Sequence, residues 1–253
     1  MPRAKRHFLP GKGYIWHISH RCHKKEFLLK FKKDKLTWLT WLTWLSRAKK
    51  AYGLRILNYV ITSNHIHLLV HDNGTPGAIS RSLHLAAGQT GQRFNRRKRR
   101  RGAFWQDRYH ATAVEQGAHL VRCIVYVDLN MVRAGVVRHP MEWPFGGYLE
   151  IQSGKTRYCL IDKQDLMRLF GFRNLKELRE AHQSWVEEAL QAGRLSREER
   201  WTDSVAVGSL EFVGRVKKEL GDRGIGKRAV GDGRIYMLQE TRSNYDTFSR
   251  GKK

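Results

Sequence analysis

Two histidines separated by one residue are the side chains in this sequence best suited to bind a metal ion. His65 and His67 lie in an apolar run that predicts a strand. Positions i and i+2 of a strand share one face, so both imidazoles can reach one ion while Ile66 points into the core. The alternative is a half-exposed strand with two surface histidines, and the spacing alone leaves both interpretations open.

Three side chains on a predicted helix further along are suited to phosphodiester chemistry. Tyr126, Asn130 and Arg133 follow i, i+4, i+7 spacing and therefore form one stripe. A phenol can act as a nucleophile, an amide oxygen can bind a hard metal ion, and an arginine can hold a phosphate. Alternatively, Tyr126 is an edge-of-core residue of an amphipathic helix.

The elements that must position these side chains alternate in type along the first 150 residues. Strands are predicted over 14–19, 54–62, 65–71 and 103–114, and helices over 26–50, 78–95 and 117–134. The order is β-α-β-β-α-β-α, which is that of a ferredoxin-like or RRM-like α+β sandwich with a four-stranded antiparallel sheet. His65 and His67 fall on the third strand, and Tyr126 falls on the third helix.

The pattern changes after about residue 150. Helices are predicted over 164–172, 175–192 and 210–220, the stretch 193–208 is polar and linker-like, and 221–253 is rich in Gly, Arg and Lys. We therefore expect one domain over residues 1–150. Residues 151–253 are expected to form a helical appendage with a basic, mobile tail.

The charge balance indicates the class of partner. The 253 residues include 48 Lys and Arg against 23 Asp and Glu, a formal net charge of +25, while 41% of the residues are hydrophobic. Such a chain is too apolar for a disordered basic tail, and a folded, strongly basic protein favours a polyanion such as nucleic acid. The sequence shows neither a signal peptide nor a membrane span, so we expect a cytoplasmic location and reduced cysteines.

A second cluster of potential metal ligands lies near the start of the chain. It consists of His17, His20, Cys22 and His23. A structural zinc site usually draws two ligand pairs from separated segments, and no matching Cys or His pair follows this cluster. The sequence therefore does not favour zinc here.

Five sequence blocks occur in an order typical of one family. They are Trp16-His17-Ile18-Ser19-His20-Arg21-Cys22, Ser63-Asn64-His65-Ile66-His67-Leu68-Leu69, Phe104-Trp105-Gln106-Asp107-Arg108-Tyr109, Tyr126-Val127-Asp128-Leu129-Asn130-Met131-Val132-Arg133-Ala134-Gly135 and Trp143-Pro144. Together they resemble the REP-associated tyrosine transposases of bacteria, which belong to the single-tyrosine HUH transposase superfamily. The resemblance covers roughly residues 8–150 and depends on the order of the blocks.

The resemblance implies a catalytic domain over residues 1–150 and a role for each candidate residue. His65 and His67 match the family's metal motif, Tyr126 matches its nucleophile, and Asn130 matches the position that completes the metal site. The implied reaction is a transesterification dependent on Mg²⁺ or Mn²⁺ that passes through a 5′-phosphotyrosine. This chain has Met131 where the family usually has proline, which concerns the local helix geometry and no reacting atom.

The implied substrate is single-stranded or hairpin DNA in the bacterial cytoplasm, at the nucleoid, with no membrane partner. The side chains expected to contact the DNA backbone are Arg96, Arg97, Lys98, Arg99, Arg100, Arg101, Arg108 and Arg133. The run over 96–101 is alternatively a solvated loop, and monomer and homodimer both remain open. Two other functions fit the same fold: a non-catalytic single-strand binder, and a metal-dependent nuclease in which water attacks.

Overall fold

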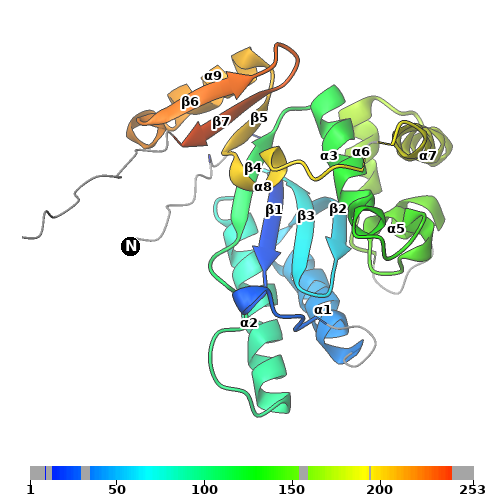
Figure 1. Ribbon diagram of the computed structural model, residues 1–253, viewed down its shortest axis with the longest axis vertical. Helices are drawn as coiled ribbons and strands as arrows, with labels where there is room; N and C mark the ends of the chain where they lie inside the picture. Colours follow the sequence, from blue (N-terminus) through cyan, green and yellow to red (C-terminus); the bar gives the residue numbers. More distant parts are fainter. Residues whose placement is uncertain (1–8, 10–12, 30–34, 154–158, 194, 241–253) are drawn as a thin grey trace, which may run out of the picture.

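The computed structural model describes residues 9, 13–29, 35–153, 159–193 and 195–240. These residues build a seven-stranded sheet with helices packed around it (Figure 1). The strands are β1 (Ile15–Arg21), β2 (Arg55–Ile61), β3 (His65–His71), β4 (His110–Val114), β5 (Ala206–Gly208), β6 (Lys227–Gly231) and β7 (Tyr236–Glu240). The α-helices are α1 (Lys35–Tyr52), α2 (Ala78–Arg97), α3 (Ala118–Asp128), α4 (Asn130–Arg133), α5 (Gly147–Ser153), α6 (Lys163–Phe170), α7 (Leu175–Gln191), α8 (Arg200–Asp203) and α9 (Leu210–Glu219), and the 3-10 helices are η1 (His23–Lys25), η2 (Pro140–Glu142) and η3 (Gly221–Gly224).

Four antiparallel strands at one end of the sheet form its predicted part. Their spatial order is β2-β3-β1-β4, and the chain order from β1 to α3 is the predicted β-α-β-β-α-β-α. The register pairs Ser19 of β1 with His67 of β3 and Ile15 with Val114 of β4. The predicted α+β class and the order of these elements are therefore confirmed.

Helices cover both faces of these four strands, which is why the central strands are apolar on both sides. Helices α1 and α2 pack against each other along one face (Figure 1). The opposite face carries His17 and His67, whose rings contact the ring of Tyr126 on α3. The nucleophile candidate and the histidine pair therefore meet on one face of the sheet.

The sheet contains three strands more than the predicted four. Strand β5 pairs in parallel with β4, β7 pairs with β5, and β6 pairs with β7 at the edge. The predicted linker is therefore wrong at β5, and the expected helical appendage is wrong at β6 and β7, whereas the predicted helix over 210–220 is observed as α9. The turn between β6 and β7 contains Asp232, whose carboxylate accepts hydrogen bonds from the backbone N–H groups of Arg234 and Ile235. Asp232 and Gly233 at this turn are a sequence signal for a hairpin. The interpretation of residues 221–253 from their Gly, Arg and Lys content does not take this signal into account.

Several predicted boundaries shift. The first helix begins at Lys35, with residues 30–34 outside the described part of the chain, and only the last five residues of the predicted strand 103–114 form β4. The third predicted helix is interrupted at Leu129 into α3 and α4. Residues 241–253 of the predicted tail lie outside the described residues, and the division into domains at residue 150 stays a prediction.

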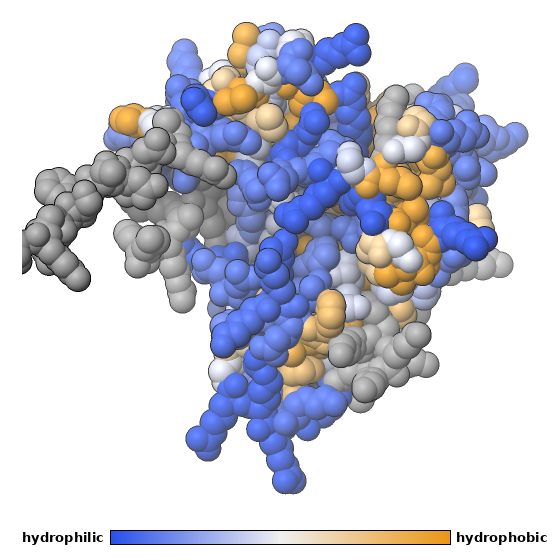
Figure 2. Space-filling view, in the orientation of Figure 1, coloured by the Kyte–Doolittle hydropathy of each residue, from blue (hydrophilic) through white to orange (hydrophobic). Residues whose placement is uncertain are grey.

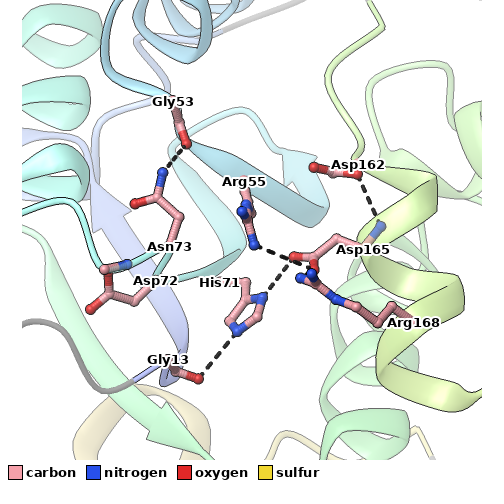
Figure 3. Close-up of polar contacts among 10 residues, drawn as sticks. Gly13, Gly53, Arg55, His71, Asp72, Asn73, Asp162, Asp165 and Arg168 are labelled. Atoms are coloured by element: carbon pink, nitrogen blue, oxygen red, sulfur yellow. Dashed lines mark hydrogen bonds and ion pairs between the residues drawn. The ribbon is translucent and has the colours of Figure 1, made fainter.

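Helix α6 is joined to the sheet by a charged cluster at the ends of β2 and β3 (Figure 3). The buried carboxylate of Asp165 lies 2.7 Å from His71 Nδ1 and 3.8 Å from Arg55 Nη1, and it also contacts the guanidinium of Arg168. His71 Nε2 faces the carbonyl of Gly13 at 3.2 Å. Because both ring nitrogens of His71 face acceptors, the ring holds α6 and the start of β1 together.

A buried contact between a carboxylate and an imidazole joins α3 to α7. Asp128, at the end of α3, lies 2.8 Å from His182 Nε2 on α7, and it accepts a 3.0 Å hydrogen bond from Asn58 on β2. The side chains of Asp128 and His182 are each 1% exposed. These contacts hold the helix that carries Tyr126 at a fixed rotation and height on the sheet.

Among the described residues, no helix is both long and apolar enough to cross a membrane.

Candidate active site

The two histidines of β3 face one cleft. The ring centroids of His65 and His67 are 4.9 Å apart, and the ring planes are nearly perpendicular at 87°. The cleft has a volume of about 220 Å³, and the guanidinium-bearing residues Arg21, Arg108 and Arg197 also line it. Two imidazoles beside three arginines are suited to a metal ion and to the phosphates of a nucleic acid.

Each histidine of the pair engages its Nδ1 atom in a hydrogen bond. His65 Nδ1 lies 2.7 Å from Asn64 Oδ1, and the Asn64 amide is oriented by its own hydrogen bond to Lys25 O at 3.2 Å. His67 Nδ1 lies 3.0 Å from Nε2 of the buried His17. Metal-binding histidines characteristically use the second nitrogen in this way. The donor set therefore fits a divalent ion held through the two Nε2 atoms.

The histidine pair is a partial ligand set. Among the described residues, no group of three or more His, Cys, Asp or Glu side chains could hold a metal ion. The remaining ligands of such an ion must then be an amide or phosphate oxygen or water. The His-Cys cluster near the N-terminus is dispersed instead: His20 Nε2 donates to Asp107 O at 2.8 Å, and Cys22 is fully buried.

Tyr126 lies against the histidines. Its ring centroid is 5.8 Å from that of His67 and 6.0 Å from that of His17, with edge-on geometry in both cases. The guanidinium of Arg133 lies over the Tyr126 ring, 4.1 Å from its centroid, and donates to the Tyr126 carbonyl at 2.7 Å. The structure therefore brings together four of the side chains that the sequence singled out: His65, His67, Tyr126 and Arg133.

Asn130 is the remaining candidate for a metal ligand. It begins α4, one turn after Tyr126, just beyond the break at Leu129, and it is half-buried. Among the described residues its side chain has no hydrogen-bond or ion-pair partner, so its amide is not engaged elsewhere. Met131, at the position where the resembled family has proline, is 4% exposed and joins the core.

Burial changes the proton affinities of these groups. Desolvation lowers the pKa of His17 and of His65 to about 4, and it lowers the pKa of His67 well below 6.5. Burial also raises the pKa of Tyr126 above 10, against the opposing effect of the Arg133 and Arg197 charges. At neutral pH the histidines are therefore neutral, the form that binds metal, and the phenol retains its proton.

Acidification is expected to destabilise the protein through these buried histidines. The pKa of each is lower in the folded state than the value of about 6.5 in an unfolded chain, so the unfolded chain binds more protons below pH 6.5. The stabilisation is fully present above pH 6.5 and is lost progressively as the pH falls toward 4. Each of the histidines His17, His65 and His67 contributes a slope of up to about 1.4 kcal/mol per pH unit.

Urea denaturation between pH 7 and pH 4.5 measures this slope. The matched control is His84→Gln, which removes an exposed histidine on α2 and should leave the slope unchanged. A free energy of unfolding that stays constant over this range in the wild-type protein would contradict the expectation.

The basic run over 96–101 is mostly exposed and ends α2. Arg97 donates to Thr37 at 2.9 Å, and Arg100 donates to Ala103 O at 2.8 Å and pairs with Glu26 at 3.6 Å. The run thus lies at the end of the sheet where β1 finishes and β3 begins. Figure 2 shows hydrophilic residues across the centre of this view and long hydrophilic side chains projecting at its lower end, where α2 ends in Figure 1.

Three residues of the site were missed by reasoning from the sequence. The sequence alone assigns His17 no role beside His67, although its parity on β1 places it on the same face as His67. Trp201 and Arg197 lie in the stretch interpreted as a linker, yet Trp201 is 0% exposed and its carbonyl lies 2.7 Å from His17 Nδ1. No local signal in the sequence indicates a contact over that separation.

Comparison with known proteins gives one family match. Residues 17–129 match the family described as "Transposase IS200 like", in agreement with the resemblance carried by the sequence blocks. No curated protein matches the chain. One similar solved structure is described as "Structure of the REP associates tyrosine transposase bound to a REP hairpin". It is 16% identical and covers 69% of this chain and 90% of its own, with a TM-score of 0.47.

Proposed function

Given an IS200-like transposase region over residues 17–129, we propose that this protein cleaves and rejoins one strand of hairpin DNA through a covalent link to Tyr126. The observation that carries the proposal is the contact of the Tyr126 ring with His67, which itself lines the cleft with the three arginines. A tyrosine, two free imidazole nitrogens and a basic cleft are the parts that this reaction needs.

The step is a transesterification. The Tyr126 oxygen attacks the scissile phosphorus in line and forms a new P–O bond, while the bond from phosphorus to the 3′ oxygen breaks. The phenolic proton leaves and the 3′ oxygen gains a proton, so the products are a 5′-phosphotyrosine and a free 3′-hydroxyl. Because one phosphodiester replaces another, a second 3′-hydroxyl can reverse the step without ATP.

Each residue of the site has its own role in the proposed reaction. His65 and His67, completed by the Asn130 amide oxygen, would hold Mg²⁺ or Mn²⁺. Neutralisation of the scissile phosphate is the chemistry that such an ion supplies when bound. Arg133 lies on the Tyr126 ring, where its charge favours the phenolate over the phenol and so opposes the effect of burial. Arg108, in the cleft wall, would hold a neighbouring phosphate.

The substrate class follows from the charge and from the exposed basic run. The net charge is +25, and residues 96–101 extend the basic surface from the cleft end of the sheet. Binding through phosphates releases counterions, so affinity falls steeply with salt. We expect the affinity for a DNA hairpin to drop by roughly 10³-fold or more between 50 and 200 mM salt, as for proteins that make six or more phosphate contacts.

A denaturing gel of the protein with end-labelled hairpin DNA and Mn²⁺ or Mg²⁺ tests the function. The expected result is a labelled protein band that survives denaturation and needs the divalent ion. Binding without cleavage would overturn the proposal in favour of a non-catalytic single-strand binder. Cleavage that leaves no protein-linked DNA would overturn it in favour of a hydrolytic nuclease.

A further inference from the structure

A chain of hydrogen bonds links α8 to the histidine pair. His17 Nδ1 lies 2.7 Å from the backbone carbonyl of Trp201, and His17 Nε2 lies 3.0 Å from His67 Nδ1. The His17 and His67 rings are stacked, with centroids 5.0 Å apart. Trp201 and His17 are 0% exposed and His67 is 3% exposed, so water does not compete for these hydrogen bonds.

The direction of each hydrogen bond follows from the carbonyl at the start of the chain. A carbonyl oxygen only accepts, so His17 Nδ1 carries the proton. Among the described residues no carboxylate contacts this ring, which is 0% exposed, and a buried imidazole without a charged partner is neutral, so its Nε2 atom is an acceptor. His67 must then donate from Nδ1, which leaves the lone pair of His67 Nε2 for another ligand.

The carbonyl that sets this direction is itself held in place. Thr112 Oγ1, on β4, lies 3.1 Å from Trp201 O and 2.7 Å from Ser204 O, and His110 Nε2 lies 3.0 Å from Ser204 O. The backbone then joins the sheet through the hydrogen bond from Ala113 N to Val205 O at 2.9 Å. The segment that holds His17 runs from α8 into β5, far outside the matched residues 17–129.

We propose that His17 is a positioning residue that fixes the tautomer and orientation of His67, so that His67 Nε2 faces the metal. This inference rests on the proposed function, because it assigns His67 as a ligand. His17 itself is not a ligand, since both of its nitrogens are engaged, one by Trp201 O and the other by His67. Residues after position 195 therefore contribute to the site although they lie outside its sequence motifs.

The tautomer of His67 can be measured without metal or DNA. Long-range ¹H–¹⁵N spectra of histidine-labelled protein distinguish a protonated Nδ1 from a protonated Nε2. In the wild-type protein we expect His67 to be protonated at Nδ1. A wild-type His67 protonated at Nε2 would overturn the proposal, whatever the variants do.

Two variants separate positioning from packing. His17→Leu fills the space without an acceptor, and we expect it to lose the single tautomer of His67 and to bind Mn²⁺ 10- to 100-fold more weakly. His17→Gln keeps an acceptor near the position of Nε2 and should retain the tautomer and most of the affinity. Electron paramagnetic resonance of unbound Mn²⁺ gives the affinity, and a thermal melt confirms folding of each variant.

The outcomes also distinguish this proposal from the proposed function. A folded His17→Leu protein with the wild-type tautomer and Mn²⁺ affinity would overturn the positioning role even if the covalent adduct forms. If the wild-type tautomer and the loss in His17→Leu are both observed but no adduct forms with DNA, the positioning role stands and the transesterase function is wrong.

Discussion

Replacing Tyr126 by phenylalanine is expected to abolish the covalent protein–DNA adduct and to slow strand cleavage by at least about 10³-fold. The phenyl ring can keep its contacts with His67 and His17 and its place beneath the Arg133 guanidinium, so the fold and the cleft should be preserved. What is removed is the only atom of this side chain that can bond to phosphorus. The adduct and the cleaved strand are measured on the same denaturing gel, and hairpin affinity is measured by gel shift.

The matched control for this substitution is Tyr52→Phe. Tyr52 ends α1, and its ring lies under the guanidinium of Arg81 at 5.4 Å, so it too is a tyrosine beside an arginine. This control should cleave as the wild-type protein does. An adduct that persists in Tyr126→Phe would show that another residue is the nucleophile. Loss of hairpin affinity together with cleavage would show that the substitution damages the fold.

The first part of the fold was predictable because its signals are local. The strand over 65–71 is predicted with its observed bounds, since an apolar run bounded by a Ser-Asn turn and a Gly-Pro break leaves little ambiguity. The same parity argument places His65 and His67 on one face. The helical spacing of Tyr126 and Arg133 likewise predicts their contact, which the structure shows at 4.1 Å.

The rest depends on contacts that no local pattern records. Strand β5 has three residues, too few to show a period, and its place beside β4 is fixed by pairing partners about 90 residues away. Strand β6 alternates weakly because much of it is exposed at the edge of the sheet. The helical periodicity of the sequence also does not predict the break at Leu129, because the residues on both sides of it are helical.

The site itself divides in the same way. Residues whose position depends on their own element, such as His65 and Tyr126, are singled out by spacing, and the resemblance supplies the roles expected of them. His17 and Trp201 act through each other over 184 positions of sequence, and only the folded sheet brings them together. The segment that runs from α8 into β5 therefore contributes to the site. Helix α8 packs against β1 and supplies the Trp201 carbonyl that holds His17.

Replacing His65 by alanine is expected to weaken Mn²⁺ binding and metal-dependent cleavage by roughly a hundredfold or more, the upper end of the loss when a ligand's supporting partner is removed. His65 is half-buried and is not a member of the hydrogen-bond chain from Trp201 through His17 to His67, so its removal should disturb packing less than removal of His67 and leave that chain intact. Adduct formation as a function of Mn²⁺ concentration, with hairpin affinity measured in parallel, gives the effect.

His84→Ala is the control, because it removes an exposed histidine of α2 and should shift neither curve. The expected signature of His65→Ala is a higher Mn²⁺ requirement with nearly unchanged hairpin affinity, since most of the basic surface remains. Cleavage at the wild-type rate and Mn²⁺ concentration in a folded His65→Ala protein would remove the histidine pair from the metal site. The ion would then have to be held by oxygen ligands such as Asn130 and the DNA phosphate, with His65 serving only as a wall of the cleft.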